Sequence, residues 1–296
     1  MFIIIKIRLL NLEKNGEDRS NMGILMMIIA TICLSFMSAM VKFLGHLPLM
    51  EIIFFRNLII MLIVPLILKN KKIPFWGNNK PVLLLRSLFS SFAAIAYFYS
   101  LTAMVLTDAV TIKQLSPIFI IFLSSIFLEE KIGLKKITIF ILAFLGALFV
   151  IKPGLHLNMV PAVIALSGAI STAGSHVALR SLRLTDHPLV IVNYFGYSAG
   201  LVSLVMLLWQ DNFVIPDALS FFILLLLGLL GLGVQYALAE AYRMAPVKLV
   251  SFYLYLQIIF GTFLGVLFFK EIPDLLSSFG ASLIIISGYL NYKLKN

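Results

Sequence analysis

The chain has 296 residues, of which 61% are hydrophobic and only 12% are charged, and its formal net charge is +10. Because soluble domains carry about a quarter charged residues, this composition excludes an ordinary soluble protein and indicates a membrane protein. The one cysteine, Cys33, excludes an internal disulfide and a cysteine-based metal site.

Apolar runs long enough to cross a bilayer, roughly 20 residues each, follow one another from Met22 onward. Residues 1–21 hold a short apolar run and a polar one, without a signal-peptide pattern, so we expect a cytoplasmic tail or an over-extended start. The runs predict an all-α integral membrane protein with ten transmembrane helices, at 22–44, 49–68, 81–101, 104–128, 134–151, 159–179, 188–209, 218–241, 248–269 and 275–292.

The charges in the connecting segments predict the orientation of these helices. If the N-terminus is cytoplasmic, most Lys and Arg side chains fall in cytoplasmic segments, and only Lys42, Lys152 and Lys270 fall in outer ones. This bias accounts for the positive charge, so nucleic-acid binding is not expected. It also predicts that both termini are cytoplasmic.

The second half of the chain repeats the first. Glu130 closes one apolar run, and Glu271 closes a similar run almost half the chain later. Because each half has an odd number of predicted helices, the second half must insert upside down relative to the first, as in many secondary transporters. We therefore predict two inverted five-helix repeats, residues 22–152 and 159–293, with a site at their interface.

Three stretches have a recognisable pattern: Leu49 to Arg56, Leu85-Arg86 with Tyr97 to Leu101, and Asp108 to Lys131 with its Ser116-Pro117 pair. Together they resemble the drug/metabolite transporter superfamily, in particular its ten-helix bacterial members with two EamA-type repeats. The resemblance implies transport of a small molecule across the bacterial inner membrane, and the sequence has no P-loop for ATP. Among the members, the pattern looks most like metabolite and amino-acid transporters, including S-adenosylmethionine carriers.

Charged residues inside the predicted spans are candidate functional residues, because such charges are costly in a bilayer. Lys113 lies near mid-span, one turn before the helix-loosening Pro117, which favours a substrate or proton site over a structural ion pair. Arg86 shares a helix stripe with Tyr97, so it either lines a cavity or snorkels to the cytoplasmic surface. Arg56 is expected to have a structural role, through backbone carbonyls or snorkelling.

Polar and aromatic residues on other spans complete the predicted site. The residues predicted to contact the substrate are Ser35, Ser38, Arg86, Tyr97, Lys113, Gln114, Gln235, Tyr236, Tyr253, Tyr255 and Gln257. A second set is predicted to be structural or to act in gating: Lys42, Glu51, Arg56, Pro117, Glu130, Glu240 and Glu271. Glu130 and Glu271 end their spans at opposite surfaces, where each can cap a helix or pair with a lysine.

The excess of intramembrane cations over deep carboxylates favours transport of an amino-acid-like solute that is zwitterionic or anionic, and export is the predicted direction. Uptake or exchange of a nucleoside-type metabolite such as S-adenosylmethionine is an alternative, as are a multidrug exporter and a non-transporting scaffold. The first span, 22–44, lacks the carboxylate that the four-helix multidrug relatives use, which disfavours the multidrug alternative. Proton coupling is open, as is the choice between a monomer and a homodimer.

The histidines give no sign of an enzyme. His46, His156, His176 and His187 all fall in predicted loops or near span ends, whereas an intramembrane catalytic or metal site needs a cluster at depth. We therefore predict no enzymatic activity, no metal and no cofactor.

Overall fold

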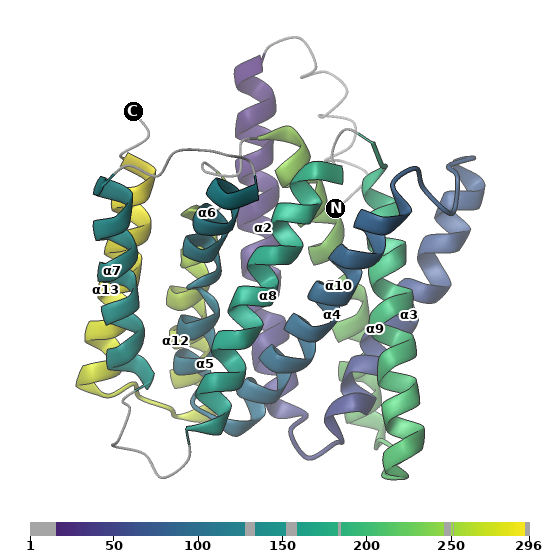
Figure 1. Cartoon of the computed structure of the whole chain (residues 1–296). Helices are drawn as coiled ribbons and strands as arrows, with labels where there is room; N and C mark the ends of the chain where they lie inside the picture. Colours follow the sequence, from purple (N-terminus) through teal and green to yellow (C-terminus); the bar gives the residue numbers. More distant parts are fainter. Residues whose placement is uncertain are drawn as a thin grey trace.

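The structure is a computed structural model that describes residues 16–127, 134–151, 159–182, 185–245, 250 and 252–293. All regular secondary structure in these residues is helical (Figure 1). The elements are α2 (Gly16–Phe43), α3 (Leu49–Asn70), α4 (Lys80–Ala103), α5 (Leu106–Lys113), α6 (Ser116–Phe127), α7 (Leu134–Ile151), α8 (Val160–Leu182), α9 (Pro188–Gln210), α10 (Ala218–Met244), the 3₁₀ turn η1 (Phe252–Tyr255), α12 (Leu256–Phe269) and α13 (Leu275–Lys293).

Within the described residues, six helices are long and apolar enough to cross a membrane: 20–43 of α2, together with α3, α4, α8, α9 and α10. Shorter apolar segments lie in α7, in η1–α12 and in α13. The described part of the chain is therefore all-helical and has the spans of a multi-pass membrane protein, as predicted. The ten-helix count and the inverted repeat stay predictions.

The distribution of side chains is the one expected of a bundle in lipid. Large apolar side chains such as Leu208, Trp209 and Phe263 are exposed on the outside of the helices, whereas Asn57, Ser87 and other polar side chains are fully buried. Hydrocarbon solvates the apolar side chains, while buried polar groups need partners inside the bundle. The buried polar side chains inside the bundle are consequently the candidates for function.

We call the end of the bundle with the loops at 44–48, 211–217 and 270–274 the lower end, and the end with the loops at 71–79 and 185–187 the upper end (Figure 1). Figure 1 shows α7 and α13 side by side at one edge. Their backbones pack closely at two glycines, since a Cβ on Gly146 would lie 2.8 Å from the carbonyl oxygen of Gly280. Small residues allow this contact, as is common between helices in membranes.

Two predicted spans are broken helices. In the span predicted at 104–128, α5 ends at Lys113 and α6 begins at Ser116. Pro117 has no amide hydrogen, so the carbonyl of Lys113 loses its helical partner at this point. The span predicted at 248–269 contains the 3₁₀ turn η1 before α12 begins at Leu256. These two breaks contact each other, because the Gln114 side-chain amide donates a hydrogen bond to the carbonyl oxygen of Leu254 at 2.8 Å.

Candidate functional site

A cavity lies between the helices, next to the two breaks. Its empty space of about 870 Å³ includes open solvent, so the cavity is open to the surroundings. Its lining comes from α2, α3, α4, α8, α9, α10, η1 and α12 and from the junction of α5 and α6. The polar lining residues are Ser38, Arg56, Arg86, Ser90, Tyr97, Lys113, Gln114, Ser116, Thr172, Ser175, His176, Gln235 and Gln257.

Lys113 is the last residue of α5, and its side chain is half-buried at the helix break. Its ammonium Nζ donates a hydrogen bond to Gln257 Oε1 at 3.2 Å and lies 4.1 Å from the centroid of the Tyr97 ring. In the part of the chain that the structure describes, no carboxylate lies within ion-pair distance of this lysine. The charge is thus positioned by an amide and a ring and is not neutralised by either.

A buried hydrogen-bond network holds these groups in place. Gln114 Nε2 donates to Gln257 Oε1 at 2.7 Å, and Gln257 Nε2 donates to the Tyr97 hydroxyl at 3.1 Å. The Tyr97 hydroxyl and Ser38 Oγ are hydrogen-bonded to each other at 2.6 Å. The network joins α2, α4, α12 and the α5–α6 junction, so residues far apart in the chain position one end of the cavity.

Arg86 is buried in α4 and is tied to two other helices. Its Nη1 donates to the carbonyl oxygen of Ile191 at 3.3 Å, and its Nη2 donates to Gln235 Oε1 at 2.9 Å. Its guanidinium carbon lies 5.5 Å from the centroid of the Phe195 ring. Arg86 therefore lines the cavity from a position fixed by α9 and α10, and it does not reach outward to the membrane surface.

Arg56, which was predicted to be structural, lies in the cavity lining. It is only 3% exposed and lines the cavity from α3. Its guanidinium carbon lies 5.2 Å from the centroid of Phe98 and 5.3 Å from that of Phe195, so aromatic rings surround it instead of backbone carbonyls. The sequence could not reveal this, because both rings belong to other helices.

The structure brings seven of the eleven predicted substrate residues to the cavity lining: Ser38, Arg86, Tyr97, Lys113, Gln114, Gln235 and Gln257. The lining does not include Ser35, Tyr236, Tyr253 or Tyr255. Successive helical residues point about 100° apart, so Tyr236 cannot face the same way as Gln235. The hydroxyl of Ser35 donates to the carbonyl oxygen of Thr31 at 3.0 Å, and the Tyr255 ring packs directly over Gly288.

Some lining residues were not among the predicted ones. Ser90 and Ser175 pair across α4 and α8 at 2.5 Å, and the signal for both is their place on small polar helix stripes. His176 was predicted near the end of its span, and α8 continues beyond it to Leu182. His176 lines the cavity, with its Nδ1 3.1 Å from the Tyr242 hydroxyl. Among the described residues, no cluster of His, Cys, Asp or Glu could hold a metal ion.

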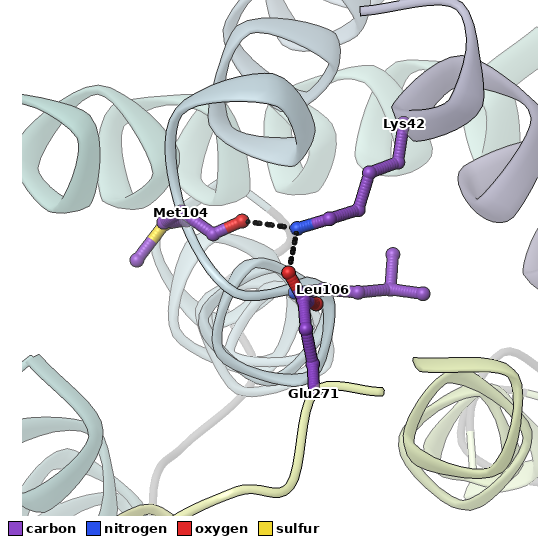
Figure 2. Close-up of polar contacts among 4 residues, drawn as sticks. All are labelled: Lys42, Met104, Leu106 and Glu271. Atoms are coloured by element: carbon purple, nitrogen blue, oxygen red, sulfur yellow. Dashed lines mark hydrogen bonds and ion pairs between the residues drawn. The ribbon is translucent and has the colours of Figure 1, made fainter. Parts of the chain in front are cut away.

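A second polar group lies at the lower end of the bundle, and Figure 2 shows its contacts. Lys42 Nζ lies 2.6 Å from Glu271 Oε1 and also donates to the carbonyl oxygen of Met104 at 2.8 Å. Glu271 Oε2 accepts the first amide hydrogen of α5, from Leu106, at 3.0 Å. This lower ion pair therefore links the end of α2, the start of α5 and the segment after α12, and Glu271 pairs with Lys42 instead of the adjacent Lys270.

Three of the other residues predicted to be structural or gating lie near helix ends or breaks. Glu51 is buried near the start of α3 and accepts the backbone amide hydrogen of Val214 at 3.0 Å. Glu240 pairs with Arg243 one turn later in α10, at 2.7 Å. Pro117 lies in the first turn of α6. Glu130 lies outside the described residues.

Comparison with known proteins adds a second line of evidence. The model of the EamA-like transporter family matches residues 21–152 and again residues 159–293. The chain is 33% identical to the pseudopaline exporter CntI of Pseudomonas aeruginosa, over 91% of this chain and 95% of that protein. It is 24% identical to the S-adenosylmethionine uptake transporter of Rickettsia prowazekii, over 89% of this chain and 90% of that protein.

A solved crystal structure is similar in fold. It has a TM-score of 0.68 and 15% sequence identity, and the match covers 94% of this chain and 97% of the other. At this identity the likeness bears on the fold alone. The matched family and the two relatives named above are transporters, and none of them is an enzyme.

Proposed function

The chain belongs to the EamA-like transporter family, within the drug/metabolite transporter superfamily, and on that premise we propose that it exports a small carboxylate-bearing metabolite across the bacterial inner membrane. One observation carries the proposal. Arg56, Arg86 and Lys113 all line the cavity, and its described lining contains no Asp or Glu. A solute carboxylate would supply the missing negative charge.

The cost of these cations supports this choice of solute. A cationic side chain at the centre of a bilayer costs roughly 2.5–3.5 kcal/mol on insertion scales, so three of them are retained only where they have a use. A carboxylate in the cavity would form charge-assisted hydrogen bonds with them. A solute ammonium would find oxygen acceptors on Gln235, Ser90 and Tyr97. The cavity thus suits an anion or an amino-acid-like zwitterion.

A lipophilic cation suits the cavity poorly, since it would meet three like charges. This argues against a multidrug exporter. A nucleoside-type metabolite such as S-adenosylmethionine stays the second candidate, with uptake as its direction, and the Rickettsia prowazekii relative favours it. We favour export as the direction of transport because the more similar Pseudomonas aeruginosa relative is named an exporter.

For the mechanism we propose alternating access by two inverted five-helix repeats, residues 22–152 and 159–293, with ten transmembrane helices in all. The match of the family model to each half supports this. The composition of the site also supports it, because Lys113 donates a hydrogen bond to Gln257 and Arg86 donates one to Gln235, in each case from the first half to the second. Inverted repeats that rock about a site at their interface are a common transporter design.

We assign the upper end of the bundle to the cytoplasm, with both termini, from the positive-inside bias. Arg86 lies near the upper end of α4, and Leu179 near the upper end of α8, so the cavity extends toward this side. The lower ion pair of Lys42 and Glu271 then acts as the outer gate, because one partner comes from each half of the chain. Proton coupling through Lys113 and a monomeric or homodimeric state stay predictions.

A ligand panel tests the proposed function. Purified protein in detergent is heated with single amino acids, organic carboxylates, nucleoside derivatives or tetraphenylphosphonium, and the melting temperature is measured. Stabilising solutes are then followed by counterflow in proteoliposomes. We expect stabilisation and counterflow with carboxylate-bearing solutes. Stabilisation by tetraphenylphosphonium alone contradicts the proposal.

A further inference from the structure

The side chain of Arg56 has a feature that the proposed function does not yet use. It is 97% buried, yet no hydrogen-bond partner exists for its Nε or Nη1 atoms within the described residues, although both atoms are shielded from solvent. Arg86 is equally buried, but two of its nitrogens are hydrogen-bonded and only its Nε is not. Arg56 is therefore the cavity cation with the most unused hydrogen-bonding capacity.

The surroundings of Arg56 do not compensate for this. Phe98 and Phe195 contact the guanidinium through their rings. The rings attract the positive charge but do not accept hydrogen bonds from the N–H groups in the guanidinium plane. A buried donor without an acceptor is costly, and a charged one more so. A guanidinium held in this way is suited to a carboxylate, which can accept two parallel hydrogen bonds from it.

The position of Arg56 is built into the neighbouring helix. A Cβ on Gly231 of α10 would lie 3.0 Å from Arg56 Nε and 3.3 Å from its Cγ. A Cβ on Gly228, one turn earlier, would lie 3.3 Å from the Arg56 carbonyl oxygen. The two glycines thus leave room for Arg56, so close packing against α10 sets the direction of its side chain.

Lys113 provides a second anion contact nearby. Its ammonium has three donors, and the one hydrogen bond described for it goes to Gln257. Lys113 lies against the ring of Tyr97 and Arg56 against the ring of Phe98, and these two ring centroids are 6.3 Å apart. The two cations thus lie against neighbouring rings and both line the cavity, so a solute with two carboxylates could meet both charges.

We propose that Arg56 binds a second carboxylate of the solute, so that the transported metabolite is a small di- or tricarboxylate. This inference rests on the proposed function, since it assigns the solute class of the same cavity. Lys113 binds one carboxylate and Arg56 binds another, while Arg86 lines the cavity where α4 contacts α9 and α10. A neutral zwitterion with one carboxylate leaves the Arg56 donors unmatched and binds more weakly.

Binding measurements with defined probes test this. Isothermal titration of the purified protein compares acetate, glycine, succinate, glutarate and tricarballylate, with glycerol 3-phosphate as a phosphate probe. The wild type is expected to bind the best dicarboxylate at least tenfold more tightly than acetate. Arg56→Gln is expected to weaken dicarboxylate binding by about 10- to 100-fold and to change acetate binding less than twofold. The matched control, Lys69→Gln on an exposed site, is expected to change neither.

Two further variants separate binding from folding. Arg56→Lys keeps the positive charge but loses the planar guanidinium that can donate two parallel hydrogen bonds. It is therefore expected to retain part of the preference for dicarboxylates. Gly231→Ala keeps the arginine but crowds its Nε, so it is expected to reduce dicarboxylate binding while acetate binding is retained. Both are compared at equal monodispersity on size exclusion, and they decide the question if Arg56→Gln does not fold.

The outcomes distinguish the two proposals. If no carboxylate of any kind binds, the proposed function fails. If acetate or glycine binds as tightly as succinate, or if the Arg56 variants lose single and double carboxylates equally, the role of Arg56 is overturned and the proposed function stands. Tighter binding of glycerol 3-phosphate than of every carboxylate also overturns the solute class inferred here.

Discussion

The lower ion pair offers the sharpest test of the transport mechanism. Lys42 comes from α2 and Glu271 from the segment after α12, so the proposed opening of the cavity at the lower end must separate them. Glu271→Gln keeps the shape of the side chain and an acceptor for the Leu106 amide but removes the charge. It should therefore favour the state in which the lower end is open.

The size of the effect follows from the burial of the pair. Hydrogen bonds to charged groups contribute roughly 1.5–3 kcal/mol, whereas fully exposed pairs contribute only about 0.2–1 kcal/mol. The side chains of Lys42 and Glu271 are 14% and 23% exposed, which is between these cases. We expect a loss of about 1 kcal/mol, which corresponds to a roughly fivefold increase in the open population.

Cysteine labelling measures this population. In a Cys33→Ser background, a cysteine replaces Met37 in the cavity lining. A membrane-impermeant maleimide is then added to vesicles of known orientation. Glu271→Gln is expected to raise the labelling rate from the outer side about fivefold, and Lys42→Gln should do the same. Lys270→Gln is the control, because this neighbouring lysine is exposed and is not part of the ion pair.

The double variant adds a further condition. If Lys42 and Glu271 act on the gate through each other, the combined change should raise labelling no more than either single change. An unchanged outer labelling rate in Glu271→Gln, at an unchanged yield of folded protein, would refute the gating argument and leave the pair a purely structural link.

Three other predictions concern the site, the packing and the loops. Lys113→Ala is expected to reduce counterflow in proteoliposomes at least tenfold without loss of folded protein, and wild-type counterflow in this variant would remove Lys113 from the site. Gly288→Ala should destabilise the protein by roughly 1–3 kcal/mol, measured by thermal unfolding, because the new methyl group overlaps the Tyr255 ring. His187 caps α9 by accepting the Leu189 amide hydrogen, and partial burial lowers the pKa of its imidazole. Its stabilising contribution is thus complete above its unfolded pKa, about 6.5, and is lost as the pH falls below that value, so His187→Asn should reduce the loss of melting temperature between pH 8 and pH 5.

The candidate site residues show which predictions need only local sequence and which need the packing of the helices. Lys113 could be found from the sequence because its signal is local: a lone charge in an apolar run, one turn before Pro117. The predicted substrate contacts in the second half were harder to choose from the sequence. Gln235 and Tyr236 are neighbours in α10, and only the rotation of that helix in the bundle decides which of them meets the cavity. That rotation depends on packing against other helices.

The sequence by itself determined that this protein lies in a membrane, where most of its helices run, and which transporter family it resembles. Insertion into a bilayer responds to the length and polarity of consecutive residues, and these are properties of the chain alone. Only the tertiary structure decided that Arg56 lies between Phe98 and Phe195, and that Glu271 pairs with Lys42 across the two halves. Contacts of this kind join helices that are distant in sequence, so their geometry is set by how the helices pack together.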